Sequence, residues 1–209
     1  MMNQSATAVR RGRKFDQVLE GARKVFMADG FEGASVDDIA RAAEVSKATL
    51  YSYFPDKRLL FMEVARSECA RHATRQLDIP EGSGPRQVLT QLARHILSVI
   101  LSEVGQKIYR ICVAETERFP DLGREFFASG PQVERDKLKD YLRAAVARGE
   151  LEIEDFDMAA EQWMALLRAD LFPRLIFNLR DGVEEAEINR VADATVDMFL
   201  ARYGASSSS

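Results

Sequence analysis

The sequence predicts an all-α protein of about nine helices, with a three-helix unit at the N-terminus and a larger helical body behind it. Apolar residues recur with the i, i+3, i+4, i+7 spacing of amphipathic helices along most of the 209-residue chain. No segment shows the strict alternation of apolar and polar residues that marks a half-buried strand. Hydrophobic residues make up 46% and charged residues 30% of the chain, a composition typical of globular proteins.

The first predicted helix begins at Phe15, where the apolar spacing starts. It is expected to end at Gly30, because glycine tolerates the left-handed conformation found past helix ends. Residues 1–14 lack this periodicity and contain four basic residues. We interpret them as a mobile basic arm, with a plain solvated tail as the alternative.

Two short helices follow, and a serine stands at the expected start of each. Ser35 should cap the second helix, with Asp38 three positions later as in a capping box. Ser46 should cap the third helix, where Leu50 takes part in a hydrophobic staple. Because proline lacks a backbone N–H and restricts the residue before it, Pro55 should end this third helix.

A longer fourth helix is expected from Asp56 to about Leu77, and the segment 80–85, rich in proline and glycine, then forms a linker. The pattern beyond the linker indicates helix after helix, with Pro173 expected to kink or locally loosen the fourth of them. The predicted body helices are 86–103, 106–117, 121–148 with a break at Gly130-Pro131, 156–179, and 184–203.

The net charge of −4 hides an asymmetry along the chain. Residues 1–75 carry 13 Lys/Arg against 10 Asp/Glu, whereas residues 76–209 carry 16 against 23. A basic front joined to an acidic rear suits a protein that touches a polyanion with one end only.

Residues 35–57 have the form short helix, tight turn, short helix, the arrangement that places its second helix in the DNA major groove. Lys47 can bring its charge to a phosphate, while Thr49 and Tyr51 can donate to a phosphate or touch base edges. The helix starts at Ser35 and Lys57 offer further phosphate sites, because free N–H groups favour an anion there. The predicted DNA-contacting residues are Ser35, Val36, Ser46, Lys47, Ala48, Thr49, Tyr51, Ser52, Tyr53 and Lys57.

These residues give the front of the chain, over 15–60, a specific resemblance to the TetR/AcrR family of bacterial repressors. One departure is Glu44, where such proteins usually carry glycine; if the turn needs a positive φ, glutamate costs roughly 1 kcal/mol there relative to glycine. A shifted turn is the alternative. The positions that carry the resemblance are Gly30-Phe31, Ser35-Val36, Ile39-Ala40, Ala43, Val45-Ser46, Leu50-Tyr51, Tyr53-Phe54 and Lys57.

The body resembles the family more loosely, in the branch that includes multidrug-efflux repressors. The resemblance implies a homodimer built mainly from the last two helices and a small-molecule effector cavity among the middle ones. The segments that carry it are Phe119-Pro120-Asp121-Leu122, Gly130-Pro131, and Tyr141-Leu142 through Gly149-Glu150-Leu151.

Five polar or aromatic residues within or beside apolar helical stripes are candidates for the effector site. Trp and Tyr can present a polar edge inside an otherwise apolar site. The alternative interpretation is that such residues belong to the core or to an interface and have satisfied hydrogen bonds. The candidates are His95, Tyr109, Cys112, Glu115 and Trp163.

Other function classes have little support in the sequence. Cys69 and His72 lie three apart, but nothing at ligand spacing completes a metal site. Cys69 and Cys112 are interpreted as reduced thiols, with redox sensing as a minor alternative. No nucleophile motif or phosphate-cradling glycine loop appears, so we expect neither an enzyme nor a cofactor. No apolar run is long enough to span a bilayer, and we expect a cytoplasmic protein.

Together these observations predict a basic arm (1–14), a helix-turn-helix DNA-binding domain (15–60), a helical effector-binding and dimerisation domain (61–204) and a Ser-rich tail (205–209). The predicted function is a repressor that binds a pseudo-palindromic operator on double-stranded DNA and is released by a largely apolar small molecule. The alternative is a small-molecule-binding protein whose DNA-binding head is degenerate. Glu44 and the modest basic charge of the front support this alternative.

Overall fold

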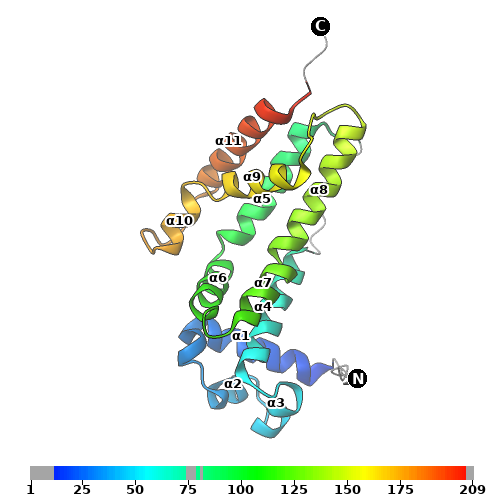
Figure 1. The fold of residues 1–209 in the computed structure, drawn as a ribbon. Coiled ribbons are helices and arrows are strands. Elements are labelled where there is room, and N and C mark those ends of the chain that lie inside the picture. Colours follow the sequence, from blue (N-terminus) through cyan, green and yellow to red (C-terminus); the bar gives the residue numbers. More distant parts are fainter. Residues whose placement is uncertain (1–11, 74–78, 81, 206–209) are drawn as a thin grey trace, which may run out of the picture. The chain divides into compact units, whose positions relative to one another are not determined.

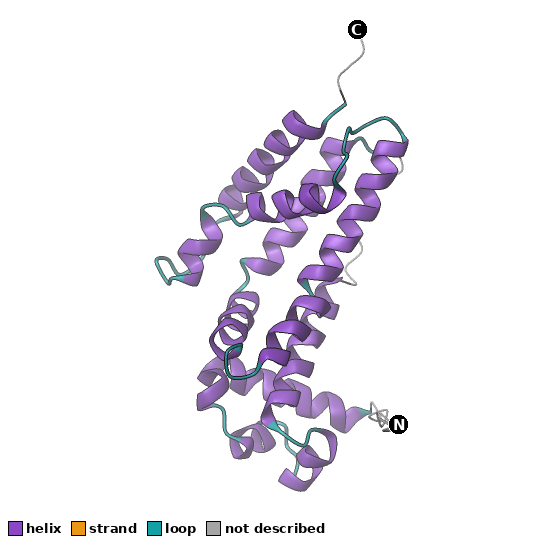
Figure 2. Ribbon diagram, viewed as in Figure 1, coloured by secondary structure: helices purple, strands orange, loops and turns teal. Residues whose placement is uncertain are grey.

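The computed structural model describes residues 12–73, 79–80 and 82–205, and the regular elements in these ranges are helices (Figure 1; Figure 2). The all-α prediction is confirmed, with eleven helices in the described residues rather than about nine. No helix among these residues is long and apolar enough to cross a membrane. In chain order the helices are α1 (Arg13–Gly33), α2 (Val36–Ala42), α3 (Lys47–Tyr53), α4 (Lys57–Ala73), α5 (Pro85–Ile100), α6 (Glu103–Glu115), α7 (Pro120–Ser129), α8 (Pro131–Ala147), α9 (Phe156–Leu167), α10 (Leu171–Ile176) and α11 (Glu185–Tyr203).

Three sequence predictions fall partly on residues that the structure does not describe. Most of the predicted basic arm and of the Ser-rich tail lies outside the described residues. The predicted end of the fourth helix near Leu77 and the side chain of His72 also lie outside them.

The chain divides into two compact units that are not contiguous in sequence. The first unit runs to Glu68 and also takes in Ile111–Phe126, whereas the second comprises Cys69–Arg110 and the chain from Phe127 onward. The divisions therefore fall inside α4, α6 and α7. The boundary predicted at residues 60–61 separates the DNA-binding domain from the effector-binding and dimerisation domain, and it stays a prediction.

In the first unit, α1 and α2 approach each other at a glycine. Gly21 is buried, and a Cβ atom added to it would lie 2.6 Å from the Cβ and the backbone nitrogen of Ala43. Further along α1, Gly30 has φ 72° and ψ −175°, so the helical backbone is interrupted there before a last turn to Gly33. Gly30 therefore adopts the left-handed φ predicted for it.

A cluster of phenylalanines forms the aromatic core of the first unit. Phe26 and Phe31 of α1 both pack edge-on against Phe61 of α4, with ring centroids 5.1 and 5.7 Å apart. Phe31 also meets Phe119, which precedes α7, at 6.0 Å. The cluster joins the helix-turn-helix region to the segment that follows α6, two parts of the chain far apart in sequence.

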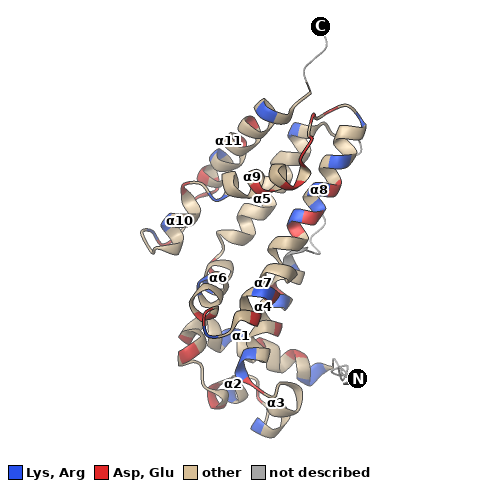
Figure 3. Cartoon of the chain, in the orientation of Figure 1, with Lys and Arg blue, Asp and Glu red and all other residues tan. Residues whose placement is uncertain are grey.

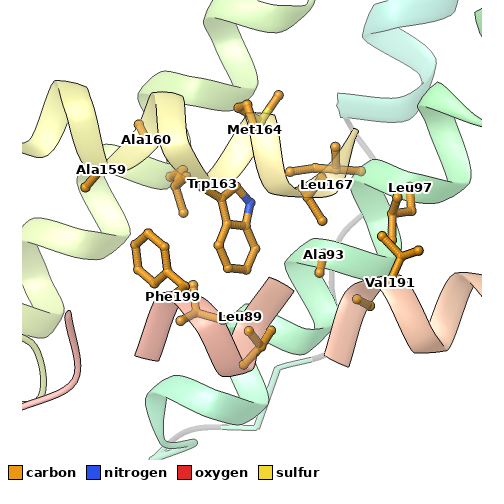
Figure 4. Close-up of a cluster of buried hydrophobic side chains, with 14 of the residues drawn as sticks. Leu89, Ala93, Leu97, Ala159, Ala160, Trp163, Met164, Leu167, Val191 and Phe199 are labelled. Atoms are coloured by element: carbon orange, nitrogen blue, oxygen red, sulfur yellow. The ribbon is translucent and has the colours of Figure 1, made fainter. Parts of the chain in front are cut away.

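The core of the second unit is built by α5, α8, α9 and α11. Trp163 of α9 is fully buried among side chains of α5 and α11 (Figure 4). Its ring packs edge-on against Phe199 of α11, with centroids 5.2 Å apart. Burying an aromatic side chain of this kind contributes about 2 to 3 kcal/mol, so these contacts hold the three helices together.

Two prolines begin helices of the second unit. Pro85 and Pro131 occupy the first turns of α5 and α8, where the missing N–H has no intrahelical partner to lose. The predicted break at Gly130-Pro131 is confirmed, because α7 ends at Ser129 and α8 begins at Pro131.

The prediction of one kinked helix over 156–179 is wrong, because two helices, α9 and α10, separate before the proline. Asp170 has φ 61° and ψ −75°, and the Leu171 N–H donates to the Ala169 carbonyl at 2.8 Å, which is a three-residue γ-turn. Pro173 cannot donate to that carbonyl as a continuous helix would require. The Asp170 carboxylate is held by Arg174 of α10, and it also pairs with Arg190 of α11.

Candidate nucleic-acid interface

The α2 and α3 helices form the predicted helix-turn-helix, and both begin at the predicted serine caps. The Ser35 hydroxyl accepts a hydrogen bond from the Asp38 N–H at 3.1 Å, and the Ser46 hydroxyl accepts one from the Thr49 N–H at 3.1 Å. Such caps stabilise a helix by about 1 kcal/mol each, which matters for helices of seven residues. Phe54 caps the C-terminus of α3 directly before the proline, as predicted.

The turn between the two helices keeps the left-handed backbone that glycine usually supplies. Glu44 has φ 54°, and its side chain is exposed. The N–H of the next residue, Val45, donates to the Ala40 carbonyl at 3.0 Å and closes the turn. Glutamate therefore costs backbone energy at this position and does not shift the turn.

One side of the recognition helix α3 packs against the rest of the unit, and its other side chains face solvent. Leu50 and Phe54 are buried, and Tyr53 packs edge-on against Phe15 of α1 with centroids 5.8 Å apart. Thr49 is half-buried and its hydroxyl lies 2.9 Å from that of Ser46. The exposed predicted DNA contacts on this helix and its cap are Ser46, Lys47, Ala48, Tyr51 and Ser52.

The N-terminus of α2 could also bind an anion, although the Asp38 carboxylate already accepts a hydrogen bond from the Ser35 hydroxyl there. Val36 is half-buried and Ser35 is exposed at this helix start. The pKa of Asp38 is held below its ordinary value mainly by the hydrogen bond from the Ser35 hydroxyl and next by the hydrogen bond from the Arg41 guanidinium. The free N–H groups of this first turn remain the candidate phosphate donors.

Lys57 lies at the start of α4, but its side chain donates hydrogen bonds to backbone carbonyls of the same chain. Its Nζ donates to the carbonyls of Phe31 at 2.7 Å and Ala34 at 3.1 Å, and it sits 4.6 Å from the centre of the Phe31 ring. These contacts fasten α4 to the corner between α1 and α2. The prediction that Lys57 reaches a phosphate stays a prediction, and the geometry favours a positioning role.

Lys47 is exposed at the start of α3 and forms an ion pair with Asp37 of α2. Figure 3 marks the basic residues in blue and the acidic residues in red along the chain. Both side chains are more than half exposed, and a surface pair of this kind contributes little to stability. A phosphate that binds Lys47 has to compete with this carboxylate. Asp37 is a residue that sequence reasoning missed, since its partner lies ten positions away along the chain.

The five candidate effector residues divide between the two compact units. Cys112 is buried and Glu115 half-buried in the part of α6 that belongs to the first unit. His95 and Tyr109 are half-buried in the second unit, where Trp163 is fully buried. The structure therefore does not bring all five into one site, and their role in effector binding stays a prediction.

Among the buried side-chain polar atoms of the second unit that have no hydrogen-bond partner in the described residues, two belong to aromatic residues. They are Nε1 of Trp163 and the hydroxyl of Tyr141, a residue that sequence reasoning did not single out as a candidate. Burial raises the pKa of Tyr141 to about 12, so its hydroxyl stays protonated at neutral pH. Both groups are donors that an acceptor could use.

Replacing Asp37 with Asn should strengthen DNA binding, because it frees Lys47 and removes a negative charge beside it. The expected gain is about two- to fivefold in affinity at low salt, and it should shrink at higher ionic strength. Fluorescence anisotropy with a labelled DNA duplex measures this. Asp29→Asn, the same charge change at an exposed site on α1, should have a smaller effect. Equal effects of the two variants would contradict competition for Lys47.

Comparison with known proteins agrees with this geometry at both ends of the chain. Residues 18–64 match the family model of bacterial regulatory proteins of the tetR family, and residues 87–205 match the C-terminal domain of AefR-like transcriptional repressors. Among curated relatives, the HTH-type regulator YdeS of Bacillus subtilis is 28% identical over 80% of this chain and 83% of its own length.

Two solved structures share both the fold and a substantial part of the sequence. A TetR-family transcriptional regulator from Mesorhizobium loti is 30% identical, with a TM-score of 0.83 over 92% of this chain and 97% of the other. The flavonoid-responsive regulator FrrA is 34% identical, with a TM-score of 0.77 over 93% and 98% of the two chains. The chain belongs to the TetR family of helix-turn-helix transcriptional regulators.

Proposed function

We propose that the chain is a homodimeric repressor that binds a pseudo-palindromic operator through α3 and leaves it when a small molecule binds the body. The observation that carries this proposal is the exposed polar face of a doubly capped helix-turn-helix, whose inward side is held by Leu50 and Phe54. The repressor AcnR of Corynebacterium efficiens supports it, being 40% identical over 57 residues that cover 27% of this chain and 30% of AcnR. We place this activity in the cytoplasm, where bacterial DNA lies.

On the operator, the side chains of α3 that we propose as DNA contacts divide into two kinds. Lys47 supplies a charge to a phosphate and positions the head without reading sequence. Thr49, Tyr51 and Ser52 carry hydroxyls that can bond a phosphate or a base edge, and Ala48 is small enough to meet a thymine methyl. Sequence preference is therefore expected from the middle of α3 and affinity from its start.

The homodimer is proposed to form through α9 and α11, the long helices near the end of the chain. Each exposes a large apolar side chain, Met158 at 52% and Met198 at 60%. The exposed surface of α11 also carries Ala194 and Ala201, which are small enough to let a second helix approach closely. A two-fold axis would place two recognition helices roughly 34 to 36 Å apart, the spacing of successive major grooves.

Release is proposed to pass through the α6–α7 connection, because that segment is part of the first unit. Phe119 packs on Phe31, and Arg118 forms an ion pair with Glu32 at the same end of α1. An effector that shifts α6 would draw these residues away from the corner that Lys57 holds. The effector must prefer the DNA-incompetent state for this to lower DNA affinity. The name of FrrA, a flavonoid-responsive regulator, favours an effector that contains aromatic rings.

Selection from a random DNA library by the full chain tests the operator proposal. We expect enrichment of a pseudo-palindrome with half-sites one helical turn apart. Thr49→Val or Tyr51→Phe should relax the preference at defined positions, with a loss of about 1 to 3 kcal/mol per base contact. Failure to enrich any sequence at low or moderate salt would favour a ligand-binding protein with a degenerate head.

Replacing Met198 with Glu should disrupt the homodimer, since a carboxylate would be buried at the proposed interface. Light scattering coupled to size exclusion should report a monomer, and operator affinity should fall by at least about tenfold as the second head is lost. Ala144→Glu, on the exposed side of α8, is the matched control and should stay dimeric. A dimeric Met198→Glu variant would show that the interface lies elsewhere.

A further inference from the structure

Arg168, at the C-terminal end of α9, is a half-buried arginine without a polar partner in the described part of the chain. Its Nε is enclosed and makes no hydrogen bond, and its guanidinium only faces the Phe172 ring, 5.6 Å from the ring centre. Leaving a buried N–H without an acceptor is costly. A ligand that carries an acceptor would satisfy this Nε–H.

The carboxylate closest to Arg168 along the chain is already engaged. Asp170 accepts from Arg174 at 2.8 Å and pairs with Arg190 as well. The hydrogen bond from Arg190, together with the charge of Arg174, holds the pKa of Asp170 below its ordinary value. Asp170 is therefore not available to neutralise Arg168, and the positive charge of Arg168 remains for another anion.

The Phe172 ring beside Arg168 leads to a second aromatic ring on α6, and a second arginine binds the end of α10. Phe172 of α10 packs edge-on against Tyr109 of α6, with centroids 5.2 Å apart. Arg110, next to Tyr109, donates from Nε to the Ile176 carbonyl at 3.1 Å and from Nη2 to the Leu175 carbonyl, at the end of α10. Its guanidinium thus bonds to backbone carbonyls, and it forms no ion pair with a carboxylate in the part of the chain that the structure describes.

We propose that Arg168, Phe172, Tyr109 and Arg110 form the effector site, and that it takes a planar aromatic molecule carrying an acidic group. The acidic group would accept charge-assisted hydrogen bonds from Arg168, while the rings of Phe172 and Tyr109 contact the ligand's aromatic body. The inference rests on the proposed function, because it names the chemistry of the effector that the repressor answers to.

The proposed site includes residues of α6, a helix shared by both units. Ligand binding there could therefore affect the DNA-binding unit. Tyr109 and Arg110 are the last residues of α6 in the second unit, and Ile111 is the first in the unit that contains the helix-turn-helix. A ligand that draws Tyr109 or releases Arg110 from the end of α10 acts directly on α6. Because α6 is one continuous helix, a displacement at Arg110 is passed to the residues that follow it.

A pair of fluorescent probes that differ only in charge tests the proposal on the full chain without DNA. 1-Anilinonaphthalene-8-sulfonate is aromatic and anionic, with a planar naphthalene ring, and N-phenyl-1-naphthylamine has the same rings without the sulfonate. The sulfonate should bind about tenfold more tightly, as expected for a charge-assisted hydrogen bond. Arg168→Met should remove this preference and leave the affinity for the neutral probe unchanged.

Arg202→Met is the matched control, because Arg202 is exposed and faces only the Tyr203 ring, 4.8 Å from its centre. It should keep the full preference for the sulfonate. If Arg168→Met does not fold by circular dichroism, Arg168→Lys should keep part of the preference and Phe172→Leu should weaken both probes. Equal binding of the two probes to the unaltered chain, or an equal loss in the Arg202 variant, would overturn the proposal. Since no DNA is present, these outcomes are independent of whether the operator proposal holds.

Discussion

The bond between Lys57 and the corner of α1 and α2 is the interaction on which the rest of the DNA-binding unit depends. Two N–H donors of one ammonium group satisfy the carbonyls of Phe31 and Ala34, and the Phe31 ring lies under its charge. The Phe31 carbonyl lies in the last turn of α1 and the Ala34 carbonyl directly follows that helix, where carbonyls have no helical donor. Lys57 thereby ties α4 to the helix-turn-helix at one point.

That same corner receives the segment after α6, so the proposed effector response would act on residues that also hold the DNA-binding helices. Phe31 contacts Phe61 of α4 and Phe119 in the α6–α7 connection, while the neighbouring Glu32 pairs with Arg118. A displacement of α6 would therefore act on the corner where Lys57 ties α4 to the helix-turn-helix. The proposed ligand site includes Tyr109 and Arg110, which precede that segment on the same helix.

The sequence predicted those features that depend on residues a few positions apart. Ser35 and Ser46 cap their helices because the acceptor and the N–H it binds are three residues apart. The partners of Lys57 lie 26 and 23 residues away, and neither periodicity nor capping rules point to them. The break before α10 was missed for the same reason, since Asp170 depends partly on Arg190, 20 residues on. The proline there was a visible signal, but it did not indicate the position of the break.

The salt dependence of operator binding by Lys57→Met tests the role of the Lys57 bonds most directly. If Lys57 fastens the head from within, the variant should unfold more easily by about 1 to 3 kcal/mol and bind the operator less tightly, with an unchanged slope of log K against log salt. A lysine that contacts one phosphate per protomer would instead make the slope of a dimer shallower by roughly 1.8. That shallower slope, with the stability of the head intact, would contradict a central structural role for the Lys57 bonds.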